Sequence, residues 1–155
     1  MRKRLIDPSS QDASPAGQEW LDLEQLARVE VTSEDAGRPI ESALVAGPGW
    51  RAAEPGEQTV RLLFDLPQRL RRVRLLFRED EEERTQEFVL RWSSDDGRTF
   101  REILRQQYHF SPPGTVAETE DYRVDLDRVT VLELSIVPSV GGGRARASLT
   151  QLRLA

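Results

Sequence analysis

The sequence predicts an all-β fold, an antiparallel β-sandwich of the jelly-roll type with about eight core strands. Three observations support this prediction. Apolar and polar residues alternate over many short segments, turn-forming residues separate these segments, and no amphipathic helical pattern extends beyond about two turns. Strands that each bury one face are accommodated by two antiparallel sheets packed face to face.

The predicted elements follow one another along the chain. The segment EWLDLEQLA supplies Trp20 and three leucines, and it is expected to form a short strand or helical turn that closes one side of the core. A period of two then marks strands in ARVEVTS, TVRLLFDL, RRVRLLF, EFVLRWS, TFREILRQ, YRVDL, VLELSIV and RASLTQLRL. Proline, glycine, serine and acidic residues fill the connections between them.

Length and composition limit the domain count and the partners. The chain of 155 residues fits one domain, expected at residues 20–155 after a polar, flexible N-terminal tail at residues 1–19. The formal net charge of -5 argues against a non-specific nucleic-acid binder. Cysteine is absent, which excludes disulfides and thiolate chemistry. Neither a signal-peptide core nor a membrane-spanning apolar run is present, so the sequence predicts a cytoplasmic protein without a membrane partner.

The stretch RWSSDDGRTFREIL has the spacing of an Asp-box, the motif of sialidases and related propellers. The pattern consists of Ser93, Asp95, Gly97, Thr99 and Phe100. A propeller needs such a pattern in every blade, at intervals of about 40 to 50 residues, and this chain has one copy. A tight hairpin also needs an acceptor Asp and a Gly with positive φ. We therefore interpret the motif as a hairpin turn.

The remaining chemistry-bearing residues predict no enzyme. His109, the single histidine, lacks the usual zinc partners and has no nucleophile elbow beside it. The acidic run at residues 79–84 is interpreted as a solvated loop, VGGGRAR at residues 140–146 as a flexible connection before a strand, and Trp50 as a buried anchor. We expect no catalytic residue, no metal ligand and no cofactor.

A longer order of motifs carries a family resemblance from about Ala27 to Ala155. A first strand ends in the turn SED, and the segment PIESAL, the step WRAAEPGE and a strand, Leu-Pro, strand pair follow it. This order resembles the discoidin family, also called coagulation-factor type C domains, within the galactose-binding-like jelly-roll superfamily. The same motifs resemble the N-terminal domain of the single-strand-break DNA repair scaffold protein. The resemblance implies a noncatalytic binder whose ligand loops lie at one end of the sandwich.

The resemblance also implies a lost calcium site. Many glycan-binding members carry a structural calcium in an Asp-Gly loop after the A-L segment, helped by a Glu near the C-terminus. Here VAGPGW follows Ala43 and Leu44, and Gln151 lies in the last strand. Calcium binding needs several oxygen ligands, usually including carboxylates.

We expect a noncatalytic intracellular module that recognises a carbohydrate or another polar ligand. A sugar ring presents one apolar face and several hydroxyls, so its site needs polar and aromatic side chains together. The candidate ligand-binding residues are Glu34, Asp35, Arg38, Arg84, Tyr108 and His109. The alternative is a protein-docking scaffold, repair- or stress-related, that uses an apolar patch of Leu63, Leu76 and Val89.

Overall fold

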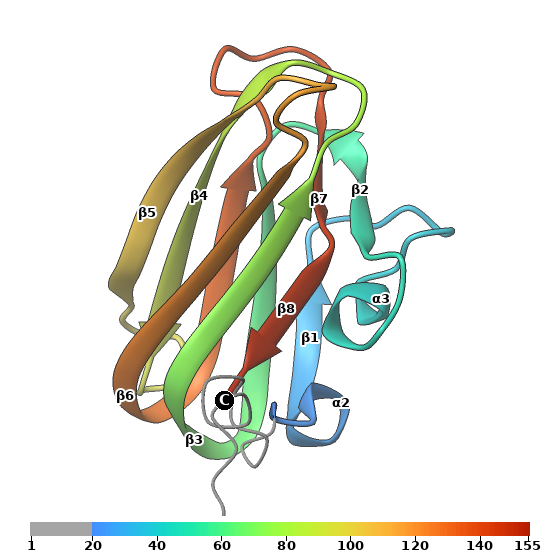
Figure 1. The fold of residues 1–155 in the computed structure, drawn as a ribbon. Coiled ribbons are helices and arrows are strands. Elements are labelled where there is room, and N and C mark those ends of the chain that lie inside the picture. The colour runs from blue at the N-terminus through green and yellow to red at the C-terminus, as the bar shows by residue number, and fades with distance from the viewer. Residues whose placement is uncertain (1–19) are drawn as a thin grey trace, which may run out of the picture.

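The described residues, 20–155, form two antiparallel layers and a short strand pair (Figure 1). The structure is a computed structural model. The tail predicted for residues 1–19 lies outside the described residues. The elements are α2 (Leu23–Leu26), β1 (Ala27–Val31), α3 (Glu41–Leu44), β2 (Trp50–Pro55), β3 (Gln58–Arg78), β4 (Arg84–Ser93), β5 (Arg101–Phe110), β6 (Ala117–Val137), β7 (Arg146–Leu149) and β8 (Gln151–Leu154). The predicted all-β jelly roll with eight strands is confirmed.

The long strands β3 and β6 take part in both layers. Residues 58–63 of β3 pair with residues 131–136 of β6, and residues 72–78 of β3 pair with residues 117–123 of β6. The first layer has the order β1-β3-β6-β4-β5, and β8 joins the other half of β3 to build the second layer. The strands β2 and β7 form a separate pair beside it.

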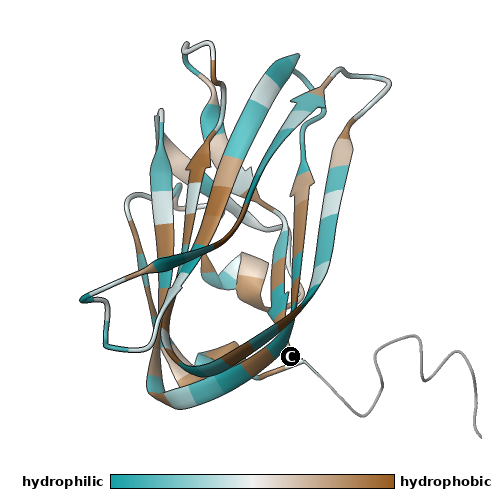
Figure 2. Ribbon diagram, turned by 90° about the vertical axis from the view of Figure 1, so that its left-hand side faces the viewer, coloured by the Kyte–Doolittle hydropathy of each residue, from teal (hydrophilic) through white to brown (hydrophobic). Residues whose placement is uncertain are grey.

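Both long strands bend where they leave the first layer. The register of β3 and β6 shifts between Leu63 and Arg72, and Figure 2 shows both ribbons curving at this end of the molecule. Pro67 has no N–H to give to the ladder, and Arg128 has a positive φ of 60°. The segments TVRLLFDL and RRVRLLF, predicted as two strands, are therefore parts of the single strand β3.

The core fills the space between the layers. Phe77 of β3 and Phe88 of β4 pack with their ring centroids 5.2 Å apart, and both are buried. Trp50 is also fully buried, and its Nε1 donates a hydrogen bond to the Ser33 carbonyl at 3.0 Å. Burying a large apolar side chain contributes about 1.5 to 3 kcal/mol. The interpretation of Trp50 as a buried anchor is confirmed.

The Asp-box pattern forms the turn between β4 and β5. Asp95 Oδ1 accepts hydrogen bonds from Ser93 Oγ at 2.6 Å and from the Thr99 amide at 2.9 Å. Gly97 has a φ of 90°. The hydrogen bonds from Ser93 and Thr99 hold the pKa of Asp95 well below its ordinary value. The motif is a hairpin turn, as predicted.

The two helices of the described residues have four residues each. Within residues 20–155, no helix has the length and apolar character that a membrane crossing requires. The helices pack at the edges of the sheets, where Leu23 and Leu44 are buried in the core.

One buried carboxyl faces the interior near the start of β6. Glu118 is 3% exposed and lies opposite Phe77. Among the described residues, no group donates a hydrogen bond to its carboxylate oxygens. Burial, aided by the neighbouring Glu120, raises the pKa of Glu118 to about 9. This carboxyl is therefore protonated at neutral pH in the folded protein.

We predict that Glu118→Gln raises the free energy of unfolding at about pH 8. Between pH 4.5 and about 9, the Glu118 carboxyl keeps its proton in the folded protein but has lost it in the unfolded chain. Stability of the unmodified protein therefore falls as the pH rises through this window, by up to about 1.4 kcal/mol per pH unit. Urea titrations across the window measure the effect, with the exposed Glu102→Gln as control. Equal pH slopes for the original protein and Glu118→Gln would contradict the prediction.

Candidate ligand-binding cleft

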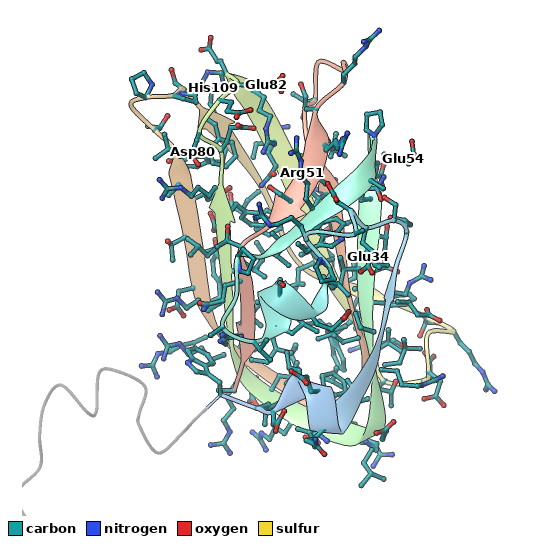
Figure 3. All side chains as sticks on the ribbon, turned by 90° about the vertical axis from the view of Figure 1, so that its right-hand side faces the viewer. Glu34, Arg51, Glu54, Asp80, Glu82 and His109 are labelled. Carbon is teal, nitrogen blue, oxygen red and sulfur yellow. The ribbon has the colours of Figure 1, made fainter. Side chains whose placement is uncertain are left out.

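A polar cleft of about 310 Å³ lies at the end of the molecule where the β3–β4 and β6–β7 loops meet the β2–β7 pair. Figure 3 shows Arg51 on β2, with Asp80 and Glu82 on the β3–β4 loop. The lining includes five arginines, four acidic residues and two hydroxyl residues: Arg38, Arg51, Arg78, Arg144, Arg146, Glu79, Asp80, Glu81, Glu82, Ser148 and Thr150. The cleft can therefore offer many hydrogen-bond donors to a polar ligand.

The pairing of β2 with β7 positions one wall of the cleft. Arg51 lies opposite Ser148, whereas Trp50 and Leu149 form the next cross-strand pair and are buried. Alternation along the strands therefore turns Arg51 and Ser148 away from the core. Gly49 precedes β2 with a φ of 97°, and a Cβ atom there would lie 2.7 Å from the Leu149 carbonyl oxygen. Only glycine permits this close approach.

The arginines of this wall have few carboxylate partners. Arg38 donates to the carbonyl of Gly49 from Nε at 3.0 Å, and this contact fixes the side chain without neutralising its charge. Arg146 lies 3.7 Å from Asp35. Within residues 20–155, neither Arg51 nor Arg144 forms an ion pair. This wall therefore presents unneutralised guanidinium groups.

The opposite wall is the β3–β4 loop, whose own hydrogen bonds shape it. Glu79 accepts hydrogen bonds from Arg84 Nε at 2.7 Å and from the amides of Glu81 and Glu82 at 2.9 and 3.1 Å. Burial raises the pKa of Glu79, but these hydrogen bonds outweigh it and leave the pKa below its ordinary value. Asp80 pairs with Arg78 at 3.1 Å. Residues 80–83 are exposed as predicted, whereas Glu79 and Arg84 form a largely buried pair.

The structure separates the six predicted ligand-binding residues. Arg38 lines the cleft, and Asp35 lies at its edge beside Arg146. Glu34 accepts a hydrogen bond from the Ile40 amide at 3.0 Å, which orders the segment before α3. The Arg84 side chain is 4% exposed, donates to the Pro138 carbonyl at 2.7 Å and stacks over Phe110. These contacts give Arg84 a structural role.

The last two predicted residues, Tyr108 and His109, lie on β5 and do not line the cleft. The Tyr108 hydroxyl donates to the Ala117 carbonyl at 3.0 Å. His109 contacts Thr85 Oγ1 at 2.8 Å and Glu83 at 2.9 Å. The Thr85 hydroxyl, the His109 imidazole and the Glu83 carboxylate are therefore arranged in the order of a hydrolase triad. The His109 and Glu83 side chains are 52% and 67% exposed. The three groups lie on the exposed surface of β4, β5 and the β3–β4 loop, outside the cleft.

Arg51, Arg78, Arg144 and Arg146 are not among the six predicted ligand-binding residues, although the sequence made the loop GGGRAR a possible part of the binding surface. Alternation indicates that Arg51, Arg78 and Arg146 point outward from their strands, and Arg144 lies in the loop between β6 and β7. Alternation does not indicate that β2, β7 and the β3–β4 loop meet around one cleft.

The segment after α3 does not fit the calcium site of the discoidin family. Arg153 of β8 donates a hydrogen bond from Nη1 to the Leu44 carbonyl at 2.5 Å. A guanidinium at this carbonyl would repel a calcium ion. Within the described part of the chain, no three histidine or acidic side chains are placed to hold a metal ion.

Comparisons with known proteins identify the fold. No protein-family model matches the chain, and no curated protein matches its sequence. The family 32 carbohydrate-binding module of NanJ from Clostridium perfringens, solved with galactose, matches with a TM-score of 0.64 at 12% identity, covering 87% of this chain and 96% of that one. The family 32 module of AlyQ, solved with 4,5-unsaturated mannuronic acid, matches with a TM-score of 0.64 at 14% identity, covering 88% and 98%. A pectin-binding module matches with a TM-score of 0.57 at 17% identity, covering 84% and 90%.

These structural matches show that the chain has the galactose-binding-like jelly-roll fold, as the resemblance to the discoidin family implied. At such low identities the likeness concerns the fold, and function must be argued from the site.

We predict that Arg84→Met lowers the free energy of unfolding by about 3 kcal/mol, because Glu79 and the Pro138 carbonyl lose their partner in a buried position. The matched control is Arg69→Met, which breaks the exposed pair with Asp125 and should cost less than about 1 kcal/mol. Urea denaturation measures both. Similar small losses in the two variants would contradict a structural role for Arg84.

We also predict that the melting temperature is insensitive to EDTA and to added calcium. Arg153→Met should lower it, because the buried Leu44 carbonyl loses its hydrogen bond at a cost of about 1 to 3 kcal/mol. Thermal melts with and without calcium test this. A calcium-dependent rise in the melting temperature of the unmodified protein would show that an ion site persists.

Proposed function

We propose that the protein is a noncatalytic carbohydrate-binding module and that its ligand site is the arginine-lined cleft. The cleft itself is the observation that carries this proposal. It combines guanidinium donors from Arg38, Arg51 and Arg146 with the hydroxyls of Ser148 and Thr150. Sugars present hydroxyls and, in acidic sugars, carboxylates, and both are hydrogen-bond acceptors that suit these donors.

The structural neighbours support the same ligand class. Modules of this fold are solved with galactose in NanJ and with an unsaturated mannuronic acid in AlyQ. A binding module of this kind holds its ligand without reacting with it. The two cleft carboxylates with the strongest contacts, Glu79 and Asp80, are bonded to Arg84 and Arg78 rather than directed at a shared ligand position. This arrangement supports binding without catalysis.

The protein-docking alternative loses the apolar patch predicted for it. Val89 is 6% exposed. Leu63 and Leu76 belong to the two halves of β3 on either side of the bend, so they lie on different layers. Since the three residues do not form one surface, the cleft is the better-supported site.

The cytoplasmic location remains a proposal of its own. The absence of cysteine from the sequence supports it. Fractionation of cells that produce the protein tests it, and recovery in the culture medium would contradict it.

We expect calorimetry with galactose, N-acetylgalactosamine, galacturonic acid and oligosaccharides of these sugars to detect binding. The double variant Arg51→Gln/Arg146→Gln should bind at least about tenfold more weakly, because each guanidinium loses charge-assisted hydrogen bonds. Arg105→Gln, on the exposed face of β5, is the control. The proposal is wrong if no sugar binds, or if the cleft variant binds as well as the control.

A further inference from the structure

The outer face of the second layer carries a row of arginines. Val73, Leu75 and Phe77 of β3 are buried, so the alternating residues turn outward. Together with the facing positions of β6 and β8, these outward residues form what we call the arginine face: Arg72, Arg74, Arg78, Arg123 and Arg153. Arg153 is held at its edge by the hydrogen bond to the Leu44 carbonyl. From Arg72 to Arg78 the face extends for about 20 Å along β3, because a strand rises about 3.3 Å per residue.

The arginine face and the cleft are continuous. Arg78 belongs to both. The Thr150 amide donates to the Leu76 carbonyl at 2.8 Å, which holds the β7–β8 junction beside β3. In Figure 1, the second half of β3, the first half of β6 and the strand β8 lie side by side in the foreground, and β7 continues toward the loop end. A ligand that fills the cleft can therefore extend along β3 without crossing the core.

The arginine face places like charges next to one another, which lowers the stability of the folded protein. Arg72 lies opposite Arg123, and Arg74 lies between Asp121 of β6 and Arg153 of β8. Like charges in directly opposed cross-strand positions are destabilising. Arg74 Nε is buried and has no hydrogen-bond partner among the described residues. Burial and the nearby Arg74 lower the pKa of Arg153.

A single carboxylate lies among these opposed pairs. Asp121 accepts two hydrogen bonds from Arg72, at 2.9 and 2.7 Å. The pKa of Asp121 is lowered by this hydrogen bond and by the charges of Arg72, Arg74 and Arg123. Asp80 pairs with Arg78 in addition, but within residues 20–155 Arg74, Arg123 and Arg153 form no ion pair, so the face retains excess positive charge.

The opposite side of the sandwich shows a different pattern. On the outer face of the first layer, Arg61 and Arg91 contact Glu133 at 2.7 and 3.5 Å, and Arg105 contacts Glu87 at 3.0 Å. The arginines Arg61, Arg91 and Arg105 of the first layer are therefore each paired with a glutamate, whereas on the second layer Arg72 and Arg78 are paired and Arg74, Arg123 and Arg153 form no ion pair within residues 20–155. A general arginine-rich composition does not account for this difference.

We propose that the arginine face extends the cleft into one binding track for a linear acidic polysaccharide, with carboxylates of successive sugar units along β3. This inference rests on the proposed function and names its ligand class. A guanidinium pairs with a carboxylate through two parallel hydrogen bonds, which suits a chain with regularly spaced acidic groups. The Trp20 ring stacks over Arg72 at 4.9 Å, and Leu76, Thr119 and Gln151 lie between the other arginines. One stacking position does not make the row of aromatic rings on which the bases of a single-stranded nucleic acid stack.

The test compares oligogalacturonides from the disaccharide to the octasaccharide. For the unmodified protein, affinity should increase with chain length and decrease with added salt. The variant Arg74→Gln/Arg123→Gln leaves the cleft intact, so it should bind the disaccharide normally and the octasaccharide about tenfold more weakly, at a few-fold for each lost charge. Arg61→Gln on the other layer should bind like the unmodified protein.

A stability measurement separates loss of binding from loss of folding. Because Arg74→Gln/Arg123→Gln relieves repulsion between opposed arginines, its melting temperature should equal or exceed that of the unmodified protein. If the disaccharide binds but affinity does not increase with chain length, the proposed track is wrong and the proposed cleft site remains. The track is also wrong if Arg61→Gln weakens octasaccharide binding as much as Arg74→Gln/Arg123→Gln does. Tighter binding of single-stranded DNA than of the octasaccharide at the same salt concentration would contradict it as well. If no oligouronide or other sugar binds, both proposals are wrong.

Discussion

The pairing of β3 with β6 is the constraint on which the rest of the structure depends. The two strands remain paired on both sides of their bend, so one ribbon supplies neighbouring strands to both layers. The first layer then adds β1, β4 and β5, and the second adds β8. The bend also decides which side chains share a face, because residues before it and after it point outward on different layers. Leu63 and Leu76 are separated in this way, and the outward arginines of β3 are brought to the side of the molecule that carries the cleft.

The arginines of the chain perform two different kinds of task. Arg84 and Arg153 reach carbonyl groups in largely or partly buried positions and stabilise loops. Arg51 and Arg144 have no ion pair within the described residues, and Arg74 has an unpaired nitrogen. A guanidinium that is neither neutralised nor fully hydrogen-bonded can gain partners from a ligand. We therefore identify the recognition surface by its arginines without partners, and not by the number of arginines in the chain.

Much of the fold could be predicted from the sequence. Alternation identified segments of every strand except β2, whose residues WRAAEP do not alternate regularly between apolar and polar. The turn chemistry of Asp95 and Gly97 identified the hairpin, and the buried position of Trp50 was predicted from its place at the entry to a core strand. The segment DLPQRL was expected to connect two strands, and the sequence could not show that it bends one continuous strand, because alternation carries no information about partner strands. Only the coordinates show that RRVRLLF belongs to a second layer.

The site was harder to predict than the fold. Arg38, predicted as a ligand contact, lines the cleft, because a loop between strands can place a charged side chain at the rim. Arg84 follows an acidic run that sequence analysis interpreted as solvated, and its buried contacts with Glu79 and Pro138 depend on the tertiary structure. Arg51 and Arg146 come together only because β2 pairs with β7.

The most direct test of this account is an NMR titration with an oligogalacturonide that follows the arginine Nε–Hε resonances. The account predicts that signals of Arg51, Arg74 and Arg146 shift together, whereas those of Arg61, Arg91 and Arg105 remain unchanged. Shifts confined to the outer face of the first layer, or to backbone amides around His109, would place recognition elsewhere and contradict it.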